Sequence, residues 1–116
     1  MPTFETWDIV RVPFPYVERP VRQHRPALVI AAKEREGGHA LLWLAMITSA
    51  ANRGWYGDIA ITDLSEAGLP VPSVVRPAKL ATIDEGDADR LGRLPASDRS
   101  EVARYLRNRL RTALDA

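Results

Sequence analysis

Short apolar segments separated by polar turns make up most of the chain, and this pattern predicts β-strands. The predicted strands span residues 9–12, 27–32, 40–47, 58–61, 73–76 and 80–83. Pro13, Phe14 and Pro15 are expected to end the first strand, because proline cannot donate a hydrogen bond to a neighbouring strand. Segments 27–32 and 40–47 are apolar nearly throughout, as is typical of strands buried on both faces. Short strands at this spacing predict a small β barrel.

A helical repeat replaces the strand pattern near the C-terminus. Apolar residues recur there every four positions, at Val102, Leu106, Leu110 and Leu114. Ser97 is the expected N-cap, and Asp98 and Glu101 are well placed in the first turn, where negative charge favours a helix. The predicted fold class is therefore mainly β, with a C-terminal amphipathic helix laid on the barrel.

The composition limits which chemistry the chain can perform. Its 116 residues fit one domain over 1–116, and the absence of cysteine excludes disulfides, thiolate metal sites and a cysteine nucleophile. Two histidines are too few for a histidine-based metal centre, so no metal or cofactor is expected. No signal pattern precedes the first strand, and no apolar run approaches the ~18 residues of a membrane span. We therefore expect a soluble, cytoplasmic protein that begins near Met1 and contacts no membrane.

Candidate phosphate-binding groups stand at the ends of two apolar segments. Arg25 and Pro26 open one segment, and Thr48 and Ser49 close the next. A guanidinium offers a planar fork of donors that matches phosphate oxygens, and a hydroxyl beside it could orient the same group. The net charge is only +1, although all of the 16 cationic residues except Lys33 and Lys79 are arginines. This arginine bias favours bidentate phosphate contacts over a generally basic surface.

Aromatic residues in the predicted loops could stack on unpaired nucleobases. Tyr16 and Trp55 are the preferred candidates, with packing in the core as the alternative for each. Tyr16 begins a basic loop, residues 16–24, that also contains Arg22.

The order of motifs along the chain resembles the PemK/MazF family of type II toxin-antitoxin toxins. The matching stretches are WDIVRVPFP at 7–15, HRPALVI at 24–30, AMITS at 45–49, SVVRP at 73–77 and KLATI at 79–83. The resemblance runs from about Glu5 into the C-terminal helix and implies a small SH3-like barrel of the PemK/MazF/CcdB type. It also implies a metal-independent, sequence-selective endoribonuclease for single-stranded mRNA, in which the neighbouring 2′-hydroxyl attacks phosphorus.

The resemblance assigns roles to individual residues. Arg25 would stabilise the phosphorane and Thr48 would bind the scissile phosphate, as catalytic residues. The expected RNA-binding residues are Ser49, Arg22, Arg76, Tyr16, Trp55 and Lys79.

The chain departs from the family pattern at three positions. Pro20 and Ala78 stand where family members often carry an acidic residue, so His24 is the candidate general base and Glu18 a weaker one. Trp7 stands where the family usually has glycine, at a turn that normally needs backbone freedom.

The resemblance also implies partners. One is a second copy of the chain, with RNA lying across the two-fold interface. Another is a cognate antitoxin with a disordered acidic tail. DNA would be contacted only indirectly, through this antitoxin. Two alternatives stay open. One is a degenerate toxin that binds RNA or antitoxin without cleavage, and the other is a CcdB-like gyrase inhibitor on the same barrel.

Overall fold

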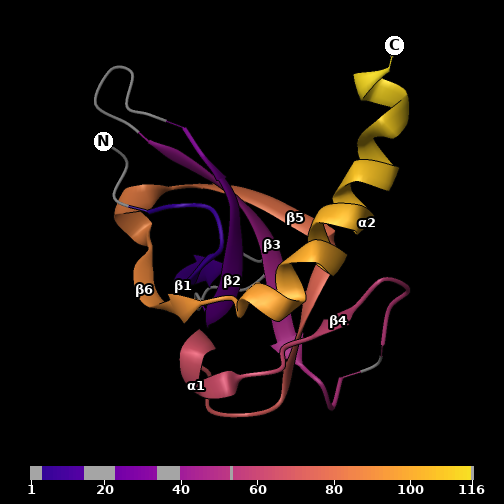
Figure 1. The fold of residues 1–116 in the computed structure, drawn as a ribbon. Helices are drawn as coiled ribbons and strands as arrows, with labels where there is room; N and C mark the ends of the chain where they lie inside the picture. The colour runs from indigo at the N-terminus through magenta and orange to yellow at the C-terminus, as the bar shows by residue number, and fades with distance from the viewer. Residues whose placement is uncertain (1–3, 15–22, 34–39, 53, 116) are drawn as a thin grey trace.

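A curled six-stranded antiparallel sheet with a long C-terminal helix forms the computed structural model, which describes residues 4–14, 23–33, 40–52 and 54–115 (Figure 1). The strands are β1 (Asp8–Phe14), β2 (Gln23–Ala32), β3 (Leu41–Ser49), β4 (Ile59–Ala60), β5 (Ser73–Asp84) and β6 (Asp89–Arg93). The helices are α1 (Leu64–Ala67), the 3-10 turn η1 (Glu85–Asp87) and α2 (Ala96–Leu114). The strand order is β4-β5-β3-β2-β1-β6. The predicted fold class, mainly β with a C-terminal helix, is confirmed.

The two central strands are buried on both faces at 27–29 and 44–47, but the expectation of burial throughout is wrong at the start of β3, where Leu41 and Trp43 are 44% and 59% exposed. Ile9, Leu28 and Ala45 belong to one core cluster, on the side of α1 and α2. Their sequence neighbours, among them Val10 and Leu44, belong to a second cluster inside the curl of the sheet. Successive strand residues point to opposite faces, so one apolar run supplies both clusters.

Two expectations about strand ends are wrong. β1 continues through Pro13 and Phe14, which pair with β2. On its other edge β1 pairs with β6 only at residues 8–11, so β6 does not need the N–H that Pro13 lacks. Segments 73–76 and 80–83 belong to a single strand, β5. Its pairing with β3 shifts between Ala45 and Met46, which leaves residues 77–79 as a bulge without partners on β3.

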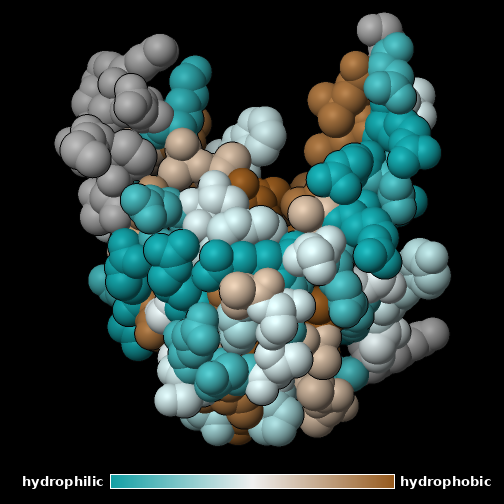
Figure 2. All heavy atoms as spheres, in the orientation of Figure 1, coloured by the Kyte–Doolittle hydropathy of each residue, from teal (hydrophilic) through white to brown (hydrophobic). Residues whose placement is uncertain are grey.

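The first half of α2 packs on the sheet, and the second half leaves it (Figure 1). Val102 is fully buried, whereas Leu110 and Leu114 are 46% and 70% exposed. The predicted helix is present, but it lies on the barrel over only part of its length. Figure 2 shows apolar atoms on this second half facing a hollow above the sheet.

The start of α2 also differs from the expected cap. Pro95 occupies the N-cap position without a side-chain hydrogen bond, and Ser97 Oγ is instead 3.2 Å from Thr62 Oγ1. Asp98 is buried and accepts hydrogen bonds from Thr62 N at 2.9 Å and Thr62 Oγ1 at 3.1 Å. A carboxylate in the first turn is thus present as predicted, and it ties the helix to the segment before α1.

Trp7 adopts a left-handed backbone conformation, with φ of +80°. Such a conformation costs a residue with a Cβ roughly 1 to 2 kcal/mol. Two backbone hydrogen bonds of 2.8 Å, from Trp7 N to Val29 O and from Leu94 N to Trp7 O, hold the turn in place. The position therefore does require the backbone freedom that a glycine would supply.

No helix in the described ranges is both long and apolar enough to cross a membrane.

Candidate functional site

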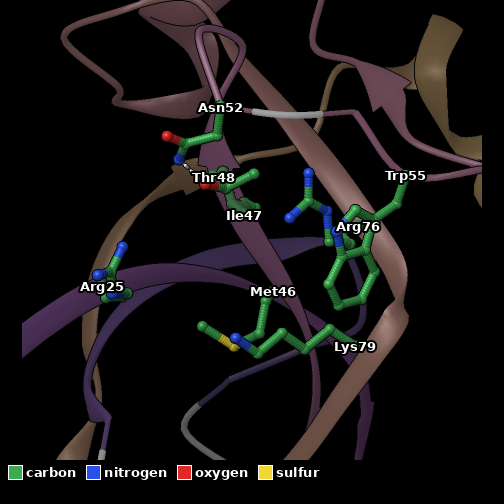
Figure 3. Close-up of a pocket in the computed structure, with 8 residues that line it drawn as sticks. All are labelled: Arg25, Met46, Ile47, Thr48, Asn52, Trp55, Arg76 and Lys79. Carbon is green, nitrogen blue, oxygen red and sulfur yellow. Dashed lines mark hydrogen bonds between the residues drawn. The ribbon is translucent and has the colours of Figure 1, made fainter.

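A cavity opens where β2 and β3 separate. The two strands pair from Ala27 and Met46 onward, but before Ala27 strand β2 pairs only with β1, and after Met46 strand β3 pairs only with β5. Pro26, which has no N–H to donate, stands at the point of separation. The cavity has a volume of about 330 Å³. Its lining residues are Arg25, Met46, Ile47, Thr48, Asn52, Trp55, Arg76 and Lys79 (Figure 3).

Arg25 and Thr48 face each other across the separated strands. Extending the register of Ala27 and Met46 by two residues places Arg25 opposite Thr48, and directly opposed residues share a face of the sheet. Asn52 Nδ2 donates a hydrogen bond of 2.5 Å to Thr48 Oγ1. Because the Thr48 oxygen accepts this bond, its own hydroxyl proton is available to donate to a ligand in the cavity.

Arg76 is fixed on the opposite wall by Asp58 and Trp55. Arg76 Nε and Nη2 donate to the two carboxylate oxygens of Asp58 at 3.1 Å and 3.0 Å. The guanidinium carbon lies 4.4 Å from the centroid of the Trp55 ring, a stacked cation–π arrangement. The Arg76 side chain is only 10% exposed, so its charge is largely compensated within the protein.

Asp58 stays ionised in this arrangement. Burial alone would raise its pKa, but the hydrogen bonds from Arg76 and from the Trp55 backbone N–H, together with the Arg76 charge, hold the pKa below its ordinary value of 3.8. Asp58 therefore acts as the acceptor that orients Arg76 over Trp55.

Lys79 adds a second kind of cation to the cavity. It comes from the 77–79 bulge of β5, and its side chain extends from β5 across Met46 toward the β2 side (Figure 3). Arg25, Arg76 and Lys79 line one cavity, and no carboxylate or imidazole of the described residues lines it with them. The arrangement suits an anion that accepts several hydrogen bonds.

Other predicted site residues lie elsewhere. His24 is exposed and does not line the cavity, because adjacent residues of β2 point to opposite faces and Arg25 occupies the cavity side. Ser49 Oγ accepts a hydrogen bond of 3.2 Å from Ala51 N and shapes the turn that carries Asn52, without lining the cavity. Tyr16 and Arg22 fall outside the described residues, as does Glu18.

Sequence reasoning missed Asn52 and Asp58. Asn52 follows Thr48 by four residues in a polar turn, where a short amide side chain often hydrogen-bonds back to a nearby group. Asp58 was assigned to the start of a predicted strand. Its position three residues after Trp55 was the missed signal, because an aspartate at this spacing often closes a turn by accepting a backbone hydrogen bond.

Comparisons with known proteins identify the family and the fold. A family model described as PemK-like, MazF-like toxin of type II toxin-antitoxin system matches residues 5–110. Among solved structures, the Mycobacterium tuberculosis toxin MazF-mt6 is 25% identical, with a TM-score of 0.61 over 85% of this chain and 92% of that one. The MazE-MazF crystal structure from Deinococcus radiodurans contains a chain of the same fold, 21% identical, with a TM-score of 0.64 over 91% and 93% of the two chains. No curated protein matches the chain.

Proposed function

Since the chain belongs to the PemK-like, MazF-like toxin family of type II toxin-antitoxin systems, we propose that it cleaves single-stranded mRNA in the cavity between β2 and β3. The observation that carries the proposal is the presence of Arg25 and Thr48 on facing sides of one cavity that Lys79 also lines. The reaction needs no metal ion, is selective for sequence, and leaves 2′,3′-cyclic phosphate and 5′-hydroxyl ends.

The residues of the cavity match the charge that develops during this reaction. The 2′-oxygen attacks phosphorus, the bond from phosphorus to the 5′-oxygen breaks, and the intermediate phosphorane carries two negative charges. Arg25 donates its planar fork to the phosphorane oxygens, and Thr48 donates its hydroxyl proton from the facing strand. Lys79 adds a positive charge beside them.

The proton transfers are expected to be the slow part of the reaction. A base must take the proton of the 2′-hydroxyl, and an acid must protonate the departing 5′-oxygen. A positioned general base contributes roughly 10²- to 10⁴-fold to a rate, and the described residues place neither a carboxylate nor an imidazole in the cavity lining. We therefore propose a slow nuclease in which electrostatic stabilisation by Arg25 dominates and water carries the protons.

A metal-free cleavage assay tests the proposed function. The pure protein is incubated with a long defined RNA in excess EDTA, and the new ends are analysed. We expect cyclic phosphate and 5′-hydroxyl ends, and no cut at a site whose nucleotide carries a 2′-deoxy sugar, because the nucleophile is then absent. RNA that is bound but stays intact would support the degenerate toxin instead. Growth arrest with DNA breaks and intact RNA would support the gyrase inhibitor.

We further propose that the protein acts as a homodimer, joined through an apolar patch formed by Leu41, Trp43 and Leu80 on the sheet together with the exposed leucines of α2. Trp43 is 59% exposed and Leu80 is 52% exposed, and both line one shallow hollow on β3 and β5. Exposed apolar side chains grouped in this way are typical of an interface with another protein surface.

Trp43→Glu should convert the dimer to a monomer, because a carboxylate at the centre of an apolar interface loses its hydration without a partner. Sedimentation equilibrium measures the mass, which for a monomer is 12.9 kDa. Val71→Glu is the matched control, since Val71 is similarly exposed at 48% but lies in the segment after α1, outside the patch. A parent protein that is already monomeric, or a dimer that survives Trp43→Glu, would contradict the proposed interface.

A cognate antitoxin with an acidic, disordered tail is the further proposed partner, in the cytoplasm, and DNA is contacted only through it. The support is electrostatic, because carboxylates of such a tail would pair with Arg25 and Lys79 in the same cavity that binds phosphate.

A further inference from the structure

A second hollow lies on the other side of the turn that carries Trp55. The turn is closed by two hydrogen bonds, from Trp55 N to Asp58 Oδ2 at 2.9 Å and from Asp58 N to Trp55 O at 3.1 Å. Trp55 faces the first cavity, whereas the rest of the turn, residues 56–58, lines a hollow of about 330 Å³ against α2. Asp58 thus borders the second hollow while its carboxylate holds Arg76 in the first.

The walls of this hollow are built to a fixed shape. Gly57 has a φ of +92°, and a Cβ at this position would lie 2.4 Å from Tyr105 Cε2. Only glycine therefore allows the Tyr105 ring of α2 to pack against the turn. The guanidinium of Arg109 lies 5.8 Å from the centroid of the same ring. Asn108 Oδ1 accepts a hydrogen bond of 3.1 Å from Arg111 Nη2, which orients the Asn108 amide.

The chemistry of the hollow fits a nucleobase better than a bare phosphate. Tyr56 is 94% exposed beside the hollow, so the face of its ring is accessible for stacking on a flat ligand. Arg104, Asn108 and Glu101 supply both donors and acceptors around the same space, as the edge of a base requires. The carboxylate of Glu101 would repel an isolated phosphate, because Glu101 is part of the same lining.

We propose that the second hollow binds a nucleobase of the RNA strand whose scissile phosphate occupies the first cavity. The inference rests on the proposed function and adds a second contact point to it, since Tyr56 directly follows Trp55 and the turn separates the two spaces. Tyr56 stacks on the base, and Arg104 and Asn108 contact its edge or the adjoining phosphate. The two spaces together would hold successive nucleotides of one extended strand.

A binding assay that requires no cleavage tests the assignment. The probe is a fluorescein-labelled pool of single-stranded RNA of random sequence, about 20 nucleotides long to cover both spaces, with 2′-fluoro sugars throughout. The fluorine removes the nucleophile, so the probe stays intact. Fluorescence anisotropy then reports the dissociation constant for each variant.

Tyr56→Ala is expected to raise the dissociation constant roughly 5- to 150-fold, the range that loss of one base–aromatic stack produces. Tyr56→Phe should bind like the parent, because it keeps the ring. Arg104→Ala should weaken binding more than Arg107→Ala, since both remove one exposed α2 charge but only Arg104 lines the hollow. Thermal melting of Tyr56→Ala should match the parent, given the exposure of that side chain.

The outcomes separate this inference from the proposed function. If Tyr56→Ala binds like the parent and the two arginine substitutions have equal effects, the second hollow does not bind a nucleobase, even if the protein cleaves RNA. A parent that binds the probe in a Tyr56-dependent way but does not cut natural RNA would overturn the nuclease and support the hollow. A parent that binds no probe would overturn the second hollow, and the metal-free cleavage assay then decides the nuclease separately.

Discussion

Arg25→Ala should slow RNA cleavage by roughly 10²- to 10³-fold, the usual effect of removing one preorganised donor from a developing negative charge. The fold should survive, because Arg25 lies at the start of β2, outside both core clusters. The measurement is the single-turnover rate of cleavage of an end-labelled RNA in EDTA, with urea unfolding as the check on stability. A variant that cleaves at the parental rate would remove Arg25 from the mechanism.

Two companion variants sharpen this test. Arg25→Lys keeps the positive charge but loses the planar fork, so it should recover only part of the rate if bidentate geometry matters. His24→Ala removes the neighbouring side chain on the opposite face of β2, and we expect a small effect because His24 does not line the cavity. A loss as large as that of Arg25→Ala would instead support His24 as the general base.

Asp58→Asn should lower the free energy of unfolding by about 3 kcal/mol, the lower end of what removal of one partner of a buried ion pair costs. The reason is that Arg76, with a side chain only 10% exposed, would keep its charge after losing the carboxylate. This is a large share of the roughly 5 to 15 kcal/mol that stabilises a typical domain. Urea unfolding near pH 7 measures the difference. Asp89→Asn, which breaks an exposed 3.7 Å pair with Arg11, is the matched control and should cost at most about 1 kcal/mol.

Lowering the pH should also remove the stability that the Asp58–Arg76 ion pair contributes. The pKa of Asp58 is lower in the folded protein than its ordinary value of 3.8, so the unfolded chain takes up the proton first as the pH falls. The stability that the pair contributes is fully present above that ordinary value and is lost as the pH falls through the lower, folded value. The difference in unfolding free energy between parent and Asp58→Asn should therefore shrink below about pH 4. Parallel curves in that range would show that Asp58 contributes nothing through its charge.

The sheet was predictable where local pattern decides the structure. Continuous apolar runs identified β2 and β3, because the stretches 27–29 and 44–47, which are covered on both faces, need no polar alternation. The sequence did not predict β6, since DRLGR has little apolar content and is a strand only because β1 offers it an edge to pair with. The division of β5 into two predicted strands had a related cause, because a bulge interrupts the sequence pattern without ending the strand.

The sequence predicted the residues at the strand ends that line the cavity, but not the ion pair beside them. Arg25 and Thr48 stand at strand ends, so strand order alone brings them to one side. Asp58 and Arg76 are 18 positions apart in the sequence, and only the path of the loop before β4 decides that they meet. For the same reason the sequence suggested Arg76 as an RNA-binding residue without showing that two of its donors already face Asp58.

The bulge at 77–79 allows β5 to line the cavity with residues that do not also pair with β3. On either side of it, β5 keeps its register with β3 and supports the core, while Lys79 reaches the cavity from residues that the ladder does not constrain. Pro77 is buried, whereas Ala78 is exposed and Lys79 half-buried, so exchanges at positions 78 and 79 can change the charge and reach of the cavity wall while the hydrophobic layers beneath stay intact. Engineering of the ligand preference of the cavity should therefore begin at Ala78 and Lys79.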